Sequence, residues 1–208
     1  MLKELQQASR NYVNIANQYE ELVEECSSLE FIAINAGIAS KQANNDSFMK
    51  LSSEIQVMSN DVTESAHQGR ETSFECVDRT TQAYGELLTM VRFYRLYDEA
   101  QNNRKELKPY AEKARKEIEH FDISRLKRDT SHMARTLENL VALVNIGKTM
   151  AIGGKIKAVY IAGSEEKFRI ITETMQESID RLFKLLENIS IEFGIIRSLF
   201  NNMKAEEV

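Results

Sequence analysis

Small or apolar residues recur at alternating intervals of three and four positions along four long stretches of the chain, which predicts four long helices that pack as in coiled coils. In the first stretch these seam residues are Tyr12, Ile15, Tyr19, Leu22, Cys26, Leu29, Ala33, Ala36, Ser40 and Ala43. In the second they are Phe48, Leu51, Ile55, Met58 and Val62, and later Val77, Tyr84, Leu87, Leu88 and Val91. In the third they are Leu126, Met133, Leu137, Leu140, Val144, Gly147, Ala151, Gly154, Ala158 and Ile161. In the fourth they are Phe168, Ile171, Met175, Ile179, Leu182, Leu186, Ile189, Phe193, Ile196, Phe200 and Met203.

One short pattern occurs twice, about 118 positions apart: Ile-Ala-Ile-Asn-Ala-Gly-Ile at 32–38 and Met-Ala-Ile-Gly-Gly-Lys-Ile at 150–156. Each copy ends a seam and is followed by a polar break, at 44–47 and at 163–166, the second break being two residues longer. A duplicated helix-turn-helix whose apolar stripes cannot be buried alone predicts two hairpins packed together, with both turns at the same end.

We therefore expect an all-α protein: an elongated antiparallel four-helix bundle or coiled coil made of two tandem helical hairpins. The hairpins are expected at about 1–104 and 109–208, in one domain that covers 1–208. Asp46 or Ser47 is expected to cap the second helix. The small seam residues near the two turns are expected to face one another, Ala33, Ala36, Ser40 and Ala43 on one side and Gly147, Ala151, Gly154 and Ala158 on the other.

Two segments depart from the seam pattern. The stretch from Ser59 to Glu75 is polar and predicts either a solvated face or a locally weaker bundle that can open. The second and third helices are expected to connect near 101–108, where two asparagines interrupt the pattern and Pro109 suits the first turn of a helix. The residues from about 90 to 119 then overhang the bundle and project, fold back or meet a partner, with Asp122 or Ser124 as the cap of a new helix. Their aromatic residues are Phe93, Tyr94, Tyr97 and Tyr110.

Composition narrows the classes of function. The net charge of −5 gives no general attraction to phosphate backbones, so nucleic acid is not an expected partner. No apolar run approaches the roughly 20 residues that span a bilayer, and the N-terminus does not resemble a signal peptide. The two cysteines, Cys26 and Cys76, would lie roughly 18 Å apart in a regular hairpin, too far for a disulfide. We expect a cytoplasmic protein with no membrane insertion.

The first copy, Ile-Ala-Ile-Asn-Ala-Gly-Ile at 32–38, then a polar turn, Phe48 and Glu54-Ile55, resembles the cytoplasmic hairpin tip of methyl-accepting chemotaxis proteins. In that family the tip reads Leu-Ala-Leu-Asn-Ala-Ala-Ile-Glu-Ala-Ala-Arg-Ala-Gly-Glu, and after the turn Phe-Ala-Val-Val-Ala. The similarity covers roughly 30 residues in the first half and is weaker in the second. Family members carry one such hairpin per chain and dimerise into a four-helix bundle, so this chain resembles both halves of that bundle joined as a monomeric pseudo-dimer, with further oligomerisation open.

The resemblance implies a non-enzymatic signalling or scaffolding module without a cofactor, which contacts protein partners at its hairpin tips. The family's tip binds a histidine kinase and its coupling protein. The family's Asn is matched by Asn35, while its tip Glu and Arg are replaced by Ala39 and Gln42 in the first copy and by Lys157 and Tyr160 in the second. The residues expected to contact partners are Asn35, Ile38, Gln42, Asn44, Asn45, Lys157, Tyr160 and Glu165.

A metal-binding bundle of the di-iron type, acting as an oxygen or redox sensor, is the alternative. Its candidate ligands are two Glu-x-x-His pairs, Glu64 with His67 and Glu117 with His120, because this spacing puts a carboxylate and an imidazole on one helix face. In a regular bundle the two histidines would lie roughly 33 Å apart and could not share a metal unless the overhang folded back.

Two further hypotheses concern modification. The segment from Ser131 to Leu137 weakly resembles the phospho-acceptor box of dimeric histidine kinases, with His132 as acceptor. The polar stretch carries acidic or amide side chains at intervals of three or four, which suits a methylatable face of the chemoreceptor kind; they are Glu64, Gln68, Glu71 and Glu75.

Overall fold

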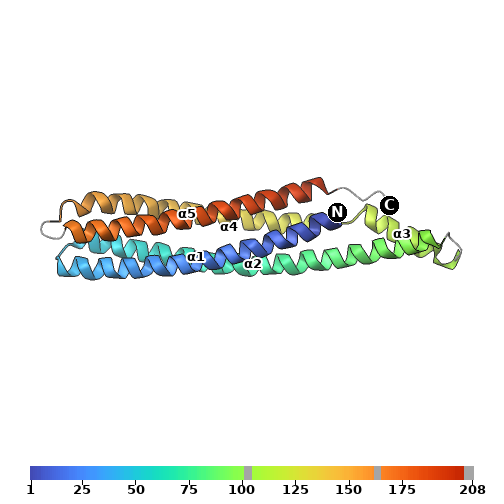
Figure 1. Ribbon diagram of the computed structural model, residues 1–208, viewed down its shortest axis with the longest axis horizontal. Helices are drawn as coiled ribbons and strands as arrows, with labels where there is room; N and C mark the ends of the chain where they lie inside the picture. The colour runs from blue at the N-terminus through green and yellow to red at the C-terminus, as the bar shows by residue number, and fades with distance from the viewer. Residues whose placement is uncertain (101–104, 162–164, 204–208) are drawn as a thin grey trace. The chain divides into compact units, whose positions relative to one another are not determined.

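The computed structural model describes residues 1–100, 105–161 and 165–203, and within these ranges it is helical without any strand. The helices follow in the order α1 (Leu2–Gln42), α2 (Asp46–Glu99), the 3-10 helix η1 (Lys105–Leu107), α3 (Lys108–Glu119), α4 (Ser124–Ala158) and α5 (Glu165–Asn202), as Figure 1 shows. The predicted all-α class and its four long helices are confirmed.

The chain divides into two compact units. Unit 1 contains residues 1–14, 73–132 and 192–208, and unit 2 contains residues 15–72 and 133–191. Each unit is described by itself below. The expectation of a single domain stays a prediction.

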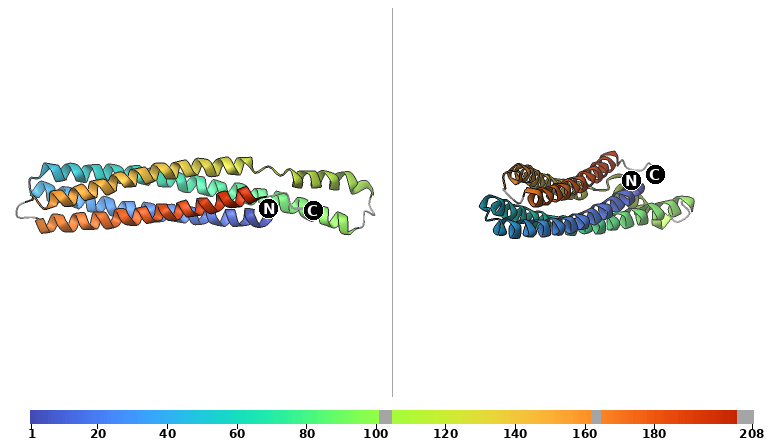
Figure 2. Two further views of the ribbon diagram at one scale, coloured as in Figure 1. Left: turned by 90° about the horizontal axis from the view of Figure 1, so that it is seen from above. Right: turned by 60° about the vertical axis from the view of Figure 1, so that its left-hand side comes forward.

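In unit 2 the two hairpin connections lie at the same end of the helices, here called the connected end. The rings of Phe48 and Phe168, at the starts of α2 and α5, are 4.4 Å apart between centroids. Lys167 Nζ also donates a hydrogen bond of 3.2 Å to Gln42 Oε1 at the end of α1. In the left view of Figure 2 the ends of α1 and α4 and the starts of α2 and α5 lie at the same end of the helices. The predicted placement of both turns at one end is therefore confirmed within this unit.

Residues related by the duplication contact each other. Phe48 and Phe168 in unit 2 are 120 positions apart, the offset expected for α2 and α5 because the second break is two residues longer. In unit 1, Tyr12 Oη and Thr130 Oγ1 are 118 positions apart and 2.6 Å from each other. A two-fold axis brings equivalent residues of its two halves together. Each of these pairs therefore lies where a pseudo-two-fold axis between the two copies would pass.

The predicted seams are buried with few exceptions. Every predicted seam residue of α4, and of α1 up to Ser40, is buried. The exceptions are partly exposed: Ala43, Val77, Tyr84, Leu88, Ile171 and Met203. On α5, Thr172 is buried beside the half-buried Ile171, and its hydroxyl donates to its own helix at Phe168 O.

The seam of α2 continues through the polar stretch, where the sequence pattern predicted only Val62. Small residues carry it at intervals of three and four: Ser59, Val62, Ala66, Gly69, Ser73, Cys76 and Thr80 are all buried. In unit 2, Gly69 lies under the ring of Tyr19, because a Cβ on Gly69 would come within 2.5–2.8 Å of three ring carbons. Ser59 Oγ donates a 2.7 Å hydrogen bond to Cys26 O on α1. Apart from Val62, the sequence pattern did not mark these buried positions, because most of them are small rather than strongly hydrophobic; the other face of the stretch is exposed, as a solvated face would be.

The expectation that Gly147 and Gly154 face the small residues of α1 was also wrong. A Cβ on Gly147 would lie 2.8 Å from the methyl carbon of Met58, and one on Gly154 would lie 2.7 Å from a methyl of Leu51. Both neighbours belong to α2. Large side chains of α2 fill the space that the glycines leave, as dense packing requires.

In unit 1 the overhang folds back as a short hairpin. Pro109 lies in the first turn of α3, as predicted, and α3 buries Ala111, Ala114 and Ile118. Met90 of α2 lines one pocket together with residues of α3, which shows that the two helices pack against each other. The backbone N–H of Ser124 donates a 2.8 Å hydrogen bond to Asp122 Oδ1 at the start of α4. Of the predicted connection, residues 101–104 lie outside the described residues.

Candidate functional site

The first predicted tip closes through its own asparagines. Asn44 has a positive φ of 51°, and the N–H groups of Asn44 and Asn45 donate to the carbonyls of Lys41 and Ser40 at 3.3 and 2.9 Å. This is the Schellman arrangement, in which a left-handed residue ends a helix. Asn45 Oδ1 then accepts the N–H of Phe48 at 3.0 Å, so Asn45 caps α2 in place of the expected Asp46 or Ser47. Asn44 and Asn45 therefore have a structural role in the turn.

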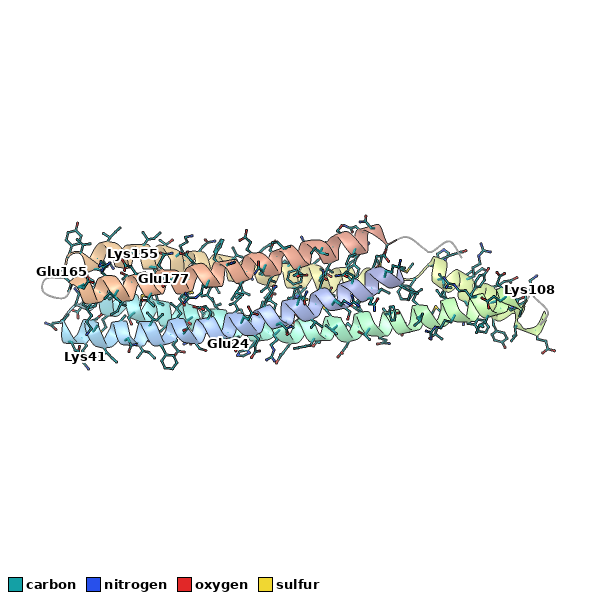
Figure 3. All side chains as sticks on the ribbon, viewed as in Figure 1. Glu24, Lys41, Lys108, Lys155, Glu165 and Glu177 are labelled. Atoms are coloured by element: carbon teal, nitrogen blue, oxygen red, sulfur yellow. The ribbon has the colours of Figure 1, made fainter. Side chains whose placement is uncertain are left out.

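The second predicted tip is only partly described. Lys157 lies in the last turn of α4, and Tyr160, just beyond it, is 81% exposed. Glu165 is the first residue of α5. Figure 3 shows Glu165 with Lys41 and Lys155 at the connected end of unit 2. Within the break predicted at 163–166, Gly163 and Ser164 lie outside the described residues.

The remaining predicted contact residues lie on α1. Asn35 and Ile38 are exposed, while Gln42 accepts the hydrogen bond from Lys167 that joins the two tips. The structure thus brings the two tips together, and Glu165 lines a pocket with Lys155 and Val159 of the second tip.

Sequence reasoning predicted Ile38 as a contact residue but missed the other exposed isoleucines near the turns. Ile34 and Ile38 on α1 are 41% and 54% exposed, and Ile152 and Ile156 on α4 are 49% and 60% exposed. Each α4 residue lies 118 positions after its α1 counterpart, so the pair is repeated at the duplication offset. The signal was present in the repeated Ile-x-x-x-Ile of both copies, but the seam pattern marks only the positions that face the core.

In unit 2 three polar side chains beside the seam form an ion network, namely Glu25, Ser178 and Arg181. Glu25 on α1, with a side chain only 17% exposed, accepts hydrogen bonds from Arg181 Nε at 3.0 Å and Nη2 at 2.9 Å, and another from Ser178 Oγ. Burial raises the pKa of Glu25, but the hydrogen bonds from Arg181 and Ser178 outweigh it, so the pKa is lower than usual. The network joins α1 to α5.

The alternative metal site gains no support from the geometry. Glu64, His67, Glu117 and His120 are all exposed, the first pair in unit 2 and the second in unit 1. His120 Nδ1 lies 3.0 Å from the carbonyl of Lys116 in its own helix. Across the described ranges, no group of three or more His, Cys, Asp or Glu side chains is arranged to hold a metal ion.

The residues of the two modification hypotheses are exposed. His132 lies on the surface of α4, and the four candidate methylation residues Glu64, Gln68, Glu71 and Glu75 lie on the surface of α2. Glu75 also pairs with Arg79 at 2.9 Å. Their modification stays a prediction.

The two cysteines are free thiols and both are buried. Burial raises the pKa of Cys26 to about 11 and that of Cys76 to about 12. A thiol that stays protonated at neutral pH is a poor nucleophile and a poor metal ligand. The cysteines therefore belong to the packing of the seams.

Protein-family models, curated proteins and solved structures were compared with the chain, and none gives a significant match. Among the described residues, no helix combines the length and the apolar character that a bilayer crossing requires. The resemblance of residues 32–55 to the chemoreceptor tip therefore stays a prediction from the sequence.

Proposed function

We propose that this protein is a cytoplasmic, non-enzymatic signalling or scaffolding module of the chemoreceptor kind. It acts through protein contacts at the connected end of unit 2. Any signal passes along it as a small change between two discrete arrangements of packed helices.

The observation that carries the proposal is the repeated pair of exposed isoleucines. Ile34 and Ile38 on α1 have the counterparts Ile152 and Ile156 on α4, and all four are between 41% and 60% exposed. Burial of apolar surface stabilises a protein by about 25 cal/mol for each Å² removed from water, so each exposed isoleucine gives up part of this stabilisation. Clustered exposed apolar residues mark interaction surfaces, and here both copies of the duplication keep them at the same positions.

The resemblance to the chemoreceptor tip suggests the class of partner. In that family the corresponding region binds a histidine kinase and its coupling protein. The charged residues Lys41, Lys155 and Glu165 also lie at the connected end (Figure 3). They form a polar surround for an apolar contact, which is the usual composition of a protein interface.

Surface plasmon resonance with purified coupling protein and kinase from a chemotaxis system tests the proposal. We expect the immobilised protein to bind at least one of them. The double variant Ile38→Asp/Ile156→Asp is expected to weaken this binding about 100-fold, because it places a carboxylate in both apolar contacts.

The matched control is Ile191→Asp, since Ile191 is also an exposed isoleucine of unit 2, 58% exposed on α5. It is expected to bind as the unchanged protein does, and circular dichroism establishes that all variants fold. Lack of binding by the unchanged protein, or an equal loss in the control, contradicts the proposal.

A further inference from the structure

A second surface of unit 2 lies between α2 and α4. It is a groove lined by Glu54, Val57 and Asp61 on α2 and by Leu143, Ile146 and Met150 on α4. Both walls have the same spacing of three and four positions, so each wall presents one helix face over two turns. Val57 is 57% exposed and Ile146 is 50% exposed, so apolar side chains stand open to solvent there.

The duplication provides a reference for this groove. The counterpart of each α4 residue lies 118 positions earlier, on α1, and the counterpart of each α2 residue lies 120 positions later, on α5. The counterpart of the groove is therefore formed by residues of α1 and α5. There Leu143 corresponds to Glu25, Ile146 to Ser28, and Asp61 to Arg181. In the counterpart, Arg181 and Ser178 bind Glu25. The charged side chains there thus bind one another, although Glu25, Ser28 and Arg181 still line an open groove.

The α2–α4 groove carries only half of this arrangement. Asp61 holds the place of Arg181, but Leu143 stands opposite where a charged partner would be required. Asp61 makes no ion pair with any residue that the structure describes, and Glu54 is paired only with Lys50, at 3.8 Å and with both side chains exposed. The groove therefore combines exposed apolar side chains with two carboxylates. Asp61 makes no ion pair with a described residue, and the Glu54–Lys50 pair is exposed to solvent.

We infer that this groove docks a basic amphipathic helix of a partner protein. The partner helix lies in the groove between α2 and α4. Its apolar side chains, at positions i, i+3 or i+4 and i+7, contact Val57, Ile146 and Met150. Lys or Arg side chains beside that stripe reach Asp61 and Glu54 and provide the charge that Arg181 provides in the counterpart groove. This site is separate from the exposed isoleucines of the proposed function.

The test uses a fluorescein-labelled peptide of roughly 18 residues, about five helical turns, built from Leu at alternating intervals of three and four, flanking Lys, and Ala elsewhere. Fluorescence anisotropy is measured on the full chain, together with a matched peptide in which Glu replaces Lys. We expect the Lys peptide to bind with micromolar affinity and the Glu peptide at least about tenfold more weakly. Ile146→Asp is expected to weaken binding of the Lys peptide by about tenfold or more. Asp61→Lys is expected to weaken binding of the Lys peptide and to improve binding of the Glu peptide.

The duplication also offers the control. Ser28 is the exposed counterpart of Ile146, so Ser28→Asp adds the same charge to the other groove and is expected to leave binding unchanged. The variant Ile38→Asp/Ile156→Asp is expected to bind the peptide normally, which separates this test from that of the proposed function. The inference is overturned if no binding occurs up to about 100 µM, if both peptides bind alike, or if Ser28→Asp weakens binding as much as Ile146→Asp. It is also overturned if sedimentation finds a dimer that Ile146→Asp dissociates, because a second copy would then occupy the groove.

Discussion

The two copies of the duplication in unit 2 have the same seam spacing but fill it differently. In the first copy, the large ring of Tyr19 on α1 lies over Gly69 on α2. Their counterparts in the second copy are Leu137 and Ile189, two buried aliphatic residues of intermediate size. A large residue beside a glycine and two medium residues fill a similar volume. The comparison teaches that the duplicated seam retains its volume and its spacing, while the individual residues are free to change.

The flanks of the seam differ more than the seam itself. Between α1 and α5 a carboxylate, a guanidinium and a hydroxyl bind one another, whereas between α2 and α4 the equivalent positions hold the half-buried Leu143, the exposed Asp61 and the buried Met58. Seam positions must fill a closed space, but flank positions meet solvent or a partner. The flanks are therefore where one copy can acquire a role that the other lacks.

The largest expected effect comes from adding a methyl group under Tyr19. We expect Gly69→Ala to lower the free energy of unfolding by about 2–3 kcal/mol, because the new Cβ would overlap a rigid aromatic ring and the gain in helix propensity offsets only part of the cost. Chemical denaturation followed by circular dichroism measures the change.

Gly85 provides the control, since a Cβ there would meet nothing within 4 Å. Gly85→Ala is expected to stabilise the protein by about 0.5–1 kcal/mol through helix propensity alone. Combining Gly69→Ala with Tyr19→Leu, which brings the pair closer to its counterpart, should recover part of the loss. Equal stability of Gly69→Ala and the unchanged protein would show that the seam tolerates the added volume.

The ion network between α1 and α5 is expected to have an intermediate effect that depends on pH. Arg181→Gln should cost about 1 kcal/mol at neutral pH, because Glu25 is largely buried although Arg181 is about half exposed. The folded pKa of Glu25 is below its usual 4.5, so the stabilisation is present above pH 4.5 and is lost as the pH falls through the lower folded value. The difference between the variant and the unchanged protein should therefore shrink below pH 4.5.

Denaturation curves at neutral pH and at about pH 3 measure this difference. Lys148→Gln is the matched control, because the Lys148–Asp180 pair of 3.6 Å is exposed on both sides. It should change stability by less than about 0.5 kcal/mol. A loss for Arg181→Gln that stayed the same at both pH values would exclude Glu25 as the cause.

The smallest expected effect is the difference in stability between the phenylalanine variants of the two buried tyrosines, Tyr12 and Tyr19. Tyr12 Oη shares a hydrogen bond with Thr130, its own counterpart position, whereas Tyr19 Oη is buried without a hydrogen-bond partner among the described residues. Tyr12→Phe should cost about 0.5–1 kcal/mol, while Tyr19→Phe should be neutral or slightly stabilising, because it removes a buried hydroxyl that gains nothing. Thermal unfolding of the two variants compares them, and a larger loss for Tyr19→Phe would show that its hydroxyl has a partner after all.

Heptad spacing predicted most of the core, because a helix with a 3.5-residue repeat puts its seam on one side whatever the neighbouring helix is. Between Ser59 and Thr80 the same reasoning predicted Val62 correctly but missed the other buried positions. Hydrophobicity marks a seam only where its residues are apolar, and there the seam consists mainly of small or hydroxyl-bearing residues opposite large ones. Of the predicted tip residues, Asn44 and Asn45 close the turn, a role that follows from their tolerance of the left-handed conformation and their capping side chains.

The sequence by itself determined the helices, the face that each one buries and the existence of two copies, because these follow from local periodicity along the chain. Only the tertiary structure decided that Met58 of α2 fills the space at Gly147, that Glu25 meets Arg181, and that Asp61 makes no ion pair with a residue that the structure describes. Residues on the flank of a helix depend on which helix lies next to them. That neighbour is set by contacts between residues more than 100 positions apart, about which a local pattern contains no information.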